Sequence, residues 1–149
     1  MPVRSAPSPA GLRLLAPVLG ALLGIGSTSA LADEYAVLGM AGKTPEQISA
    51  LLGPPGGCQD TYQGSACQYA EGAIEVTFID GQADWFTFAN PPVSFDIRAL
   101  AHIGLRPIEP LVRMPSRMHW LYHHGLEQIS VYGSGETVLF IHVRAFTPE

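Results

Sequence analysis

Positive charge is scarce in this chain of 149 residues, which has eight lysine and arginine residues against thirteen aspartate and glutamate residues. Lys43 is the only lysine, and two of the arginines, Arg4 and Arg13, fall within the first thirty-two residues. From Asp33 onward six basic residues face thirteen acids, which gives a net charge of −7. Polyanions repel a protein with this balance, so we expect neither nucleic acid nor an anionic membrane surface as its partner.

A long hydrophobic run is also missing. The longest apolar stretch, Leu14–Ile25, is interrupted by a proline and by glycines, and it is too short for a good membrane span. It follows the two arginines and precedes the small residues Ala30-Leu31-Ala32, which is the order of an export signal. We therefore expect residues 1–32 to be a cleaved signal peptide. The mature chain of 117 residues would then lack a membrane span and be periplasmic or secreted. A retained amphipathic anchor is the alternative.

Cysteine is rare as well, because Cys58 and Cys67 are the only two. Neither lies near residue 32, so a lipid-anchored mature terminus is not expected. Eight residues separate them, which excludes the Cys-x-x-Cys motif of a redox pair. An even cysteine count in an exported protein favours a disulfide. We predict that Cys58 and Cys67 are bonded and that the bond clamps the loop Gln59–Ala66 between a helix and a strand.

Convergent catalytic groups are absent from the sequence. Gly133-Ser134-Gly135 lies between two predicted strands and lacks the Gly-x-Ser-x-Gly pattern of a strand-to-helix nucleophile elbow. Asp80 and Asp84 are close in the sequence, but Asp80 is expected to lie in a β-turn. The sequence therefore gives no specific support for a catalytic pair of carboxylates. We therefore expect that the protein is not an enzyme and that it uses no cofactor.

The densest group of metal-ligating residue types consists of Met114, Met118, His119, His123 and His124, and the first four are the candidate ligands. Methionine and histidine together hold copper in oxidising compartments, so a periplasmic copper-handling protein is the alternative function. Met118 and His119 are neighbours on a predicted strand and point to opposite faces, so the whole group does not converge on one ion. Met118 also suits a core face that it would share with Trp120 and Tyr122.

The strongest structural signals lie in the first half of the mature chain. Thr44-Pro45-Glu46-Gln47 combines a helix cap, a proline suited to the first turn and the glutamine of a capping box. Gly53-Pro54-Pro55 ends that helix. Three strands are predicted next: Ser65–Tyr69, Ile74–Ile79 and Gln82–Ala89. The last two form a hairpin joined by the two-residue turn Asp80-Gly81. The last strand has large side chains on both faces and therefore belongs in the middle of a sheet or between layers.

A degraded copy of this plan follows the break at Asn90-Pro91-Pro92. Ser94 suits the start of a second helix that Gly104 ends. Three further strands are predicted: Met118–Tyr122, Leu126–Tyr132 and Thr137–Arg144. We therefore predict an α+β fold of two tandem repeats, each a helix followed by a three-stranded antiparallel meander, that share one core. The repeats would be residues 33–90 and 91–149.

The run GKTPEQISALLGPP from Gly42 to Pro55, followed by the strand and turn VTFIDGQ that end at Gln82, resembles a known family. It is similar to the helical opening and hairpin of the small envelope proteins related to the outer-membrane assembly lipoprotein BamE (SmpA/OmlA). The tandem arrangement resembles the secreted β-lactamase-inhibitory protein group. The resemblance implies two α+β units and a noncatalytic binding protein of the envelope or exterior. This chain lacks the lipid-attachment cysteine of the assembly lipoproteins.

These observations predict an exported, noncatalytic protein that binds another protein, of the inhibitor, immunity or envelope-assembly accessory type. Residues 33–97 carry a net charge of −8 and residues 98–149 carry +1, so the acidic half would steer a basic partner, unless the asymmetry serves only solubility. Sheet faces with exposed rings are common binding surfaces. The predicted contact residues are Trp85 and Trp120, with Asp84 and Tyr122 at the rim. The alternative is that all these rings belong to the core.

Overall fold

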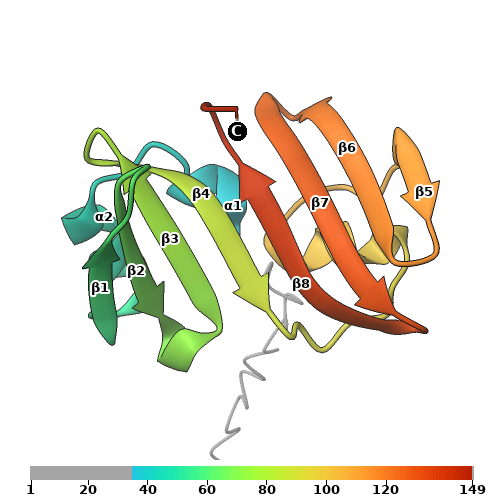
Figure 1. Cartoon of the computed structure of the whole chain (residues 1–149), viewed down its shortest axis with the longest axis horizontal. Helices are drawn as coiled ribbons and strands as arrows, with labels where there is room; N and C mark the ends of the chain where they lie inside the picture. The colour runs from blue at the N-terminus through green and yellow to red at the C-terminus, as the bar shows by residue number, and fades with distance from the viewer. Residues whose placement is uncertain (1–34, 149) are drawn as a thin grey trace, which may run out of the picture.

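The computed structural model describes residues 35–148, and its main element is one antiparallel sheet of eight strands (Figure 1). Across the sheet the strands run in the order β1-β2-β3-β4-β8-β7-β6-β5. Their bounds are β1 (Gly57–Asp60), β2 (Ser65–Tyr69), β3 (Ile74–Ile79), β4 (Gln82–Ala89), β5 (Val112–Met114), β6 (Arg117–His123), β7 (Leu126–Ser134) and β8 (Thr137–Arg144). Because β4 pairs with β8 at the centre, both halves of the chain build a single sheet.

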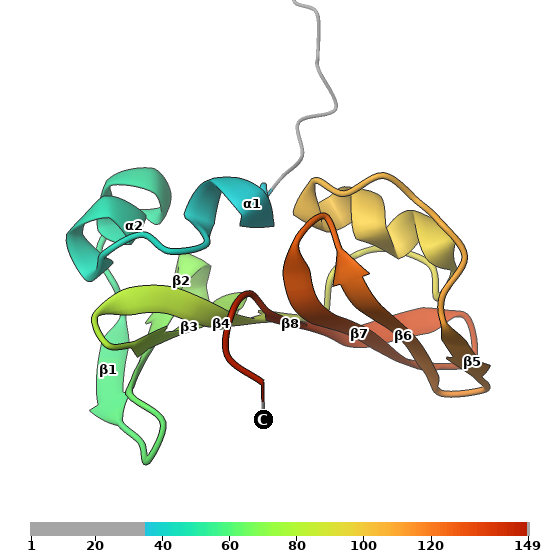
Figure 2. The same cartoon turned by 90° about the horizontal axis from the view of Figure 1, so that it is seen from above.

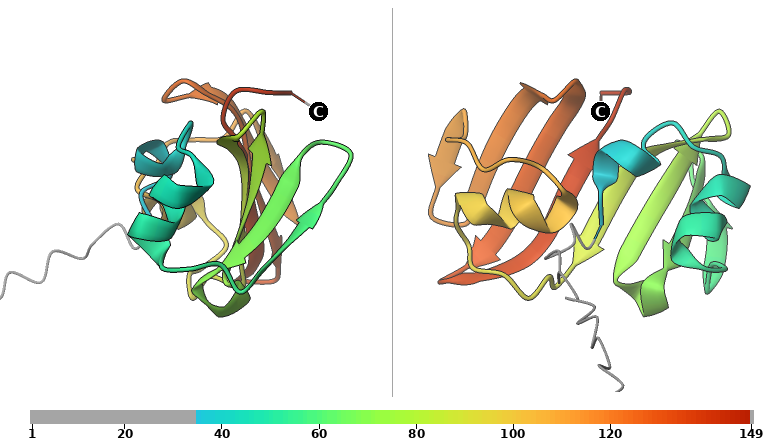
Figure 3. Two further views of the ribbon diagram at one scale, coloured as in Figure 1. Left: turned by 90° about the vertical axis from the view of Figure 1, so that its left-hand side faces the viewer. Right: turned by 180° about the vertical axis from the view of Figure 1, so that it is seen from behind.

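The helices are short, and all except the one that joins β2 to β3 lie on one side of the sheet. They are α1 (Val37–Met40), α2 (Pro45–Leu52) and the 3-10 helices η1 (Ala70–Gly72) and η2 (Ile97–Ile103). Figure 2 shows α1, α2 and the yellow η2 above the sheet, with no helix below it. The side-on view on the left of Figure 3 shows the same two layers for the first half of the chain.

Helix α2 confirms the predicted start signal. The Thr44 hydroxyl accepts a hydrogen bond from the Gln47 backbone N–H, and the Gln47 side chain accepts one from the Thr44 N–H, which completes the capping box. Pro45 occupies the first turn, where a missing N–H costs nothing. Gly53, with φ at +86°, follows the last helical residue as predicted.

The predicted β-hairpin and disulfide are both present. β3 and β4 join at Asp80 and Gly81, whose φ angles of +51° and +77° suit a two-residue turn. Cys58 on β1 and Cys67 on β2 face each other in the ladder and are bonded. The strand β4 lies between β3 and β8, which agrees with the expectation that it is central.

The core fills the space between the sheet and the helices as one continuous cluster. Alternate residues of the central strands supply it, because successive side chains of a strand point to opposite faces. The helices contribute Ile48 from α2, and Leu100 and Ile103 from η2. The buried strand residues include Ile74, Val76, Phe86, Phe88, Met118, Trp120, Ile129, Val131, Ile141 and Val143.

The predicted fold class is wrong. In place of two helix-plus-three-strand repeats, the molecule is mainly one eight-stranded antiparallel sheet with few short helices. β1 extends the sheet where a clamped loop was expected, and β5 adds a strand at the opposite edge. The second helix is a seven-residue 3-10 helix that Asp96 caps, not an α-helix capped by Ser94. The fold implied by the resemblance to the assembly lipoproteins and the inhibitory group is overturned by the same observation.

Candidate functional site

The side of the sheet that carries no helix is the uncovered face. Residues that are directly opposite each other on neighbouring strands share a face of the sheet. The strand register therefore identifies which residues belong to the uncovered face. Each alternates with core residues of the same strand. They are Glu75 and Thr77 on β3, Trp85 and Thr87 on β4, Phe140, His142 and Arg144 on β8, Gln128, Ser130 and Tyr132 on β7, and Arg117, His119 and Leu121 on β6.

A row of side-chain hydrogen bonds, made of two separate sets, lies on this face. Thr87 Oγ1 on β4 lies 3.1 Å from His142 Nδ1 on β8. Ser130 Oγ on β7 lies 2.9 Å from His119 Nδ1 on β6 and accepts a bond from Gln128 Nε2. Gln128 Oε1 in turn accepts a bond from Arg144. These bonds fix the rotamers of side chains that no helix covers, so the face is held in one arrangement before anything binds.

Aromatic rings lie beside this row. The rings of Tyr132 and Phe140 stack with centroids 4.4 Å apart. The Arg144 guanidinium lies 5.3 Å from the centroid of the Trp85 ring, within range of a cation–π interaction. Phe140 is 36% exposed and Leu121 is 41% exposed, so apolar surface remains open to solvent between the polar groups.

The C-terminal segment crosses one end of the uncovered face, as Figure 2 shows. The buried Asp84 carboxylate accepts hydrogen bonds from the backbone N–H groups of Phe146 and Thr147 and from the Thr147 hydroxyl. Trp85 Nε1 donates to the Thr147 carbonyl at 3.0 Å. A small apolar hollow of about 180 Å³ lies here, lined by Tyr62, Gln63, Ile79, Trp85, Thr147 and Pro148.

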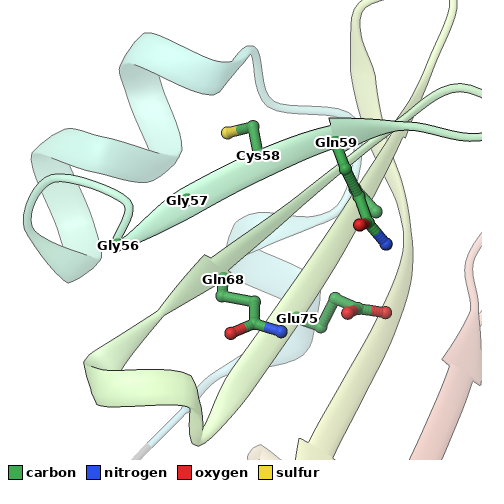
Figure 4. Close-up of a pocket in the computed structure, with 7 residues that line it drawn as sticks. Gly56, Gly57, Cys58, Gln59, Gln68 and Glu75 are labelled. Carbon is green, nitrogen blue, oxygen red and sulfur yellow. The ribbon is translucent and has the colours of Figure 1, made fainter.

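The first half of the uncovered face has a different character. Gln59, Gln68 and Glu75 come from β1, β2 and β3 and line a polar hollow of about 220 Å³ (Figure 4). The disulfide residue Cys58 turns its sulfur away from these three side chains. Two amides and one carboxylate offer hydrogen bonds, but they bring no aromatic ring and no cation.

Two histidines on β6 have altered proton affinity. Partial burial, with Arg117 and Arg144 nearby, lowers the pKa of His119. Burial also lowers the pKa of His123, although its contact with the Arg106 carbonyl works in the opposite direction. Both side chains therefore bind a proton less readily than an unperturbed histidine.

The structure does not bring the four predicted contact residues together. Trp85 is half-buried on the uncovered face. Trp120 lies in the core, where its Nε1 donates to the Ile108 carbonyl. Tyr122 is 72% exposed, because a φ of +53° breaks the alternation that would have placed it beside Trp120. Asp84 is 4% exposed and anchors the C-terminal segment, so it does not form a rim.

The predicted methionine and histidine group is also separated. Met118 is buried in the core, whereas Met114 is exposed on the edge strand β5. Both sulfurs lie beside arginines, at 3.5 Å from Arg113 Nη1 and 3.7 Å from Arg117 Nη2 respectively. His119 bonds Ser130 on the uncovered face, and the Nε2 of His123 faces the Arg106 carbonyl.

Sequence reasoning missed Arg117, Ser130 and Phe140 as members of this surface. The alternation of β6, β7 and β8 predicts two faces for these strands, but it does not tell which of the two faces a helix will cover. A usable signal was present in β7, where Gln128 and Ser130 alternate with Ile129 and Val131. That alternation indicates one polar and one apolar side.

Two further properties concern the part of the chain that the structure describes. Within residues 35–148, no helix is both long and apolar enough to cross a membrane. In the same range, no cluster of three or more histidine, cysteine, aspartate or glutamate side chains is placed to hold a metal ion. The proposed signal peptide, residues 1–32, lies outside the described residues, and the division at residue 90 stays a prediction.

Comparison with known proteins gives little. No family model matches the chain, and no curated protein matches it. Among solved structures, an extracellular protein containing a SCP domain from Bacillus anthracis str. Ames aligns with a TM-score of 0.47 and 12% identity. The alignment covers 76% of this chain and 46% of that one, so it spans less than half of the neighbour. The resemblance to the BamE-related and β-lactamase-inhibitory proteins finds no support among these matches.

Proposed function

We propose that the chain is an exported, noncatalytic protein that binds another protein through the uncovered face of its sheet. The observation that carries this proposal is the two sets of hydrogen bonds on this face, Thr87–His142 and Arg144–Gln128–Ser130–His119, flanked by partly exposed rings. A binding surface needs apolar area for affinity, polar groups for specificity and little side-chain freedom to lose. This face has all three, and the disulfide fits folding in an oxidising compartment.

The surroundings of Ser130 support a noncatalytic role. A serine bonded to a histidine is a familiar start for nucleophilic catalysis. Here the Ser130 side chain is 1% exposed, and its hydroxyl is engaged by both His119 and Gln128. No carboxylate among the described residues bonds to His119 to orient its ring. A substrate carbonyl therefore has no path to the hydroxyl, and the pair is better suited to fixing the His119 ring.

Photo-crosslinking by position tests the proposal. A photoreactive phenylalanine analogue is placed at Phe140 or Leu121 on the uncovered face, or at Leu51, which is 57% exposed on α2. After irradiation of the exported protein in its host, we expect one shared product from positions 140 and 121 and none from position 51. Equal products from all three positions, or products from position 51 alone, would contradict the proposal. Thermal unfolding of each version confirms that it is folded.

A further inference from the structure

Arg117 is a partly buried arginine on the uncovered face of β6. Its Nε is buried without a hydrogen-bond partner within residues 35–148, and its Nη2 lies 3.7 Å from the thioether sulfur of Met114. Guanidinium groups normally bind carboxylates, often through two parallel hydrogen bonds. Arg98 and Arg113 show this behaviour, since they pair with Asp96 and Glu109. Arg117 forms no such ion pair with any described residue.

The side chains next to Arg117 across the sheet are aromatic or apolar. Tyr132 is its cross-strand partner on β7, and Tyr132 stacks on Phe140 of β8. Met114 is its partner on β5 and is 48% exposed. The strands β5 to β8 contain one acid, Glu127, and alternation places it on the opposite side from Gln128 and Ser130. The strands β5 to β8 therefore place no carboxylate of their own beside Arg117 on the uncovered face.

We propose that Arg117 receives a carboxylate from an acidic segment of the protein partner, which docks on the uncovered face of β5 to β8. This inference rests on the proposed function and names the chemistry of the partner. The stacked pair Tyr132 and Phe140 supplies the apolar contact, and the guanidinium supplies the charged one. The partner surface on this half is thus acidic, although the net charge of −8 on residues 33–97 suggested a basic partner for the other half.

An acidic protein segment fits this surface better than a nucleic acid or a sulfated polysaccharide. Those polymers carry dense charge and are bound by many cations along a groove. Here the chain as a whole carries −5, and exposed apolar side chains such as Leu121, Val112 and Met114 surround the cations. A peptide that alternates carboxylates with apolar side chains matches both features.

Fluorescence anisotropy with the purified mature protein tests this inference. The probe is a short labelled peptide in which glutamate alternates with phenylalanine, and its counterpart carries glutamine in place of glutamate. We expect the glutamate peptide to bind at least about tenfold more tightly, a difference of ~1.4 kcal/mol. Arg117→Gln should remove most of that preference, and Arg117→Lys, which keeps the charge but loses the fork, should remove part of it. The control Arg106→Gln removes the same charge from an exposed loop position and should leave it unchanged.

Equal binding of the two peptides, absence of binding, or wild-type behaviour of Arg117→Gln would overturn the inference. Tighter binding of a heparin fragment than of the glutamate peptide would overturn it in favour of a polyanion. Failure of the Arg117 inference can be distinguished from failure of the proposed function by crosslinking. If the crosslinks from positions 140 and 121 persist in Arg117→Gln at wild-type yield, the face binds a protein but not through this carboxylate. If those crosslinks are absent from the wild-type protein, the proposed function itself fails.

Discussion

The two faces of the sheet differ in what their side chains do for the fold. On the covered face, residues such as Phe86, Ile129 and Val143 meet the helices in one dry cluster. On the uncovered face, the partners of the same strands bond one another in a row and leave rings partly in solvent. Burial of apolar area dominates stability, so the covered face determines the fold. The uncovered face is ordered by hydrogen bonds among its own side chains, which is the property that the proposed binding role requires.

The largest effect should come from the covered face. Trp120→Ala removes a ring that is 2% exposed and leaves both a cavity and an unpaired Ile108 carbonyl. We expect it to lower the free energy of unfolding by about 3–5 kcal/mol. Urea unfolding followed by circular dichroism measures this. A loss below ~1 kcal/mol would show that Trp120 is not a core residue and would break the contrast between the faces.

The Asp84 anchor should come next. Asp84→Ala leaves the Phe146 and Thr147 backbone N–H groups without their acceptor and frees the segment that crosses the uncovered face. We expect a loss of about 1–3 kcal/mol. The control Asp60→Ala removes the same charge from an exposed end of β1 and should change stability little. An equal effect of the two substitutions, measured by the same unfolding assay, would argue that charge and not hydrogen bonding is responsible.

Trp85 is the counterpart of Trp120 on the other face, and its truncation should cost less. Trp85→Ala loses the bond to the Thr147 carbonyl and the contact with Arg144, but the ring is only half-buried. We expect about 1–2 kcal/mol, clearly less than for Trp120. Thermal unfolding of both variants side by side measures the difference. If the two costs were the same, the faces would not differ in the way described.

The smallest effect concerns pH. Because the pKa of His119 is lowered in the folded chain, the unfolded chain takes up its proton first on acidification, near the ordinary histidine pKa of about 6.5. The contribution of a neutral His119 is therefore complete above that pH and is lost as pH falls through the lowered folded value. The lowered pKa of His123 acts in the same direction.

His119→Gln isolates the His119 part of this effect. We expect the variant to lose less stability than the wild-type protein between about pH 7.5 and about pH 5.5. Urea midpoints at the two pH values give the comparison. Identical acid sensitivity of the two proteins would show that the uncovered row does not disfavour a charged His119.

Local signals in the sequence predicted the elements that depend on near neighbours. Thr44 and Gln47 gave the start of α2, Asp80-Gly81 gave the β3–β4 hairpin, and the cysteine pair gave the disulfide. These features involve contacts within about ten residues, and each has a strong stereochemical preference. The order of the central strands and the pairing of β4 with β8 depend on distant residues, which no local signal specifies.

The missed elements have weak local signals for identifiable reasons. β1 is Gly-Cys-Gln-Asp, which has no apolar alternation, and its register follows from the disulfide and from β2. β5 has three residues and lies between Pro110 and Pro115. The prediction of the candidate site was less accurate than the prediction of the strands. Residue type alone favours Trp120 as a contact residue and does not indicate Arg117. Only the packing of η2 and the loop after it decides which side of β6 is buried.

The central claim is that the uncovered face is the binding surface, and one paired measurement tests it most directly. The photoreactive analogue is placed at Leu121 in two backgrounds, Phe140→Ala on the uncovered face and Leu51→Ala on α2. Both substitutions remove an exposed apolar side chain and should leave the protein folded. We predict that the yield of the crosslinked product falls severalfold in Phe140→Ala and stays at the wild-type value in Leu51→Ala. An unchanged yield in Phe140→Ala, or an equal fall in both backgrounds, would contradict the claim.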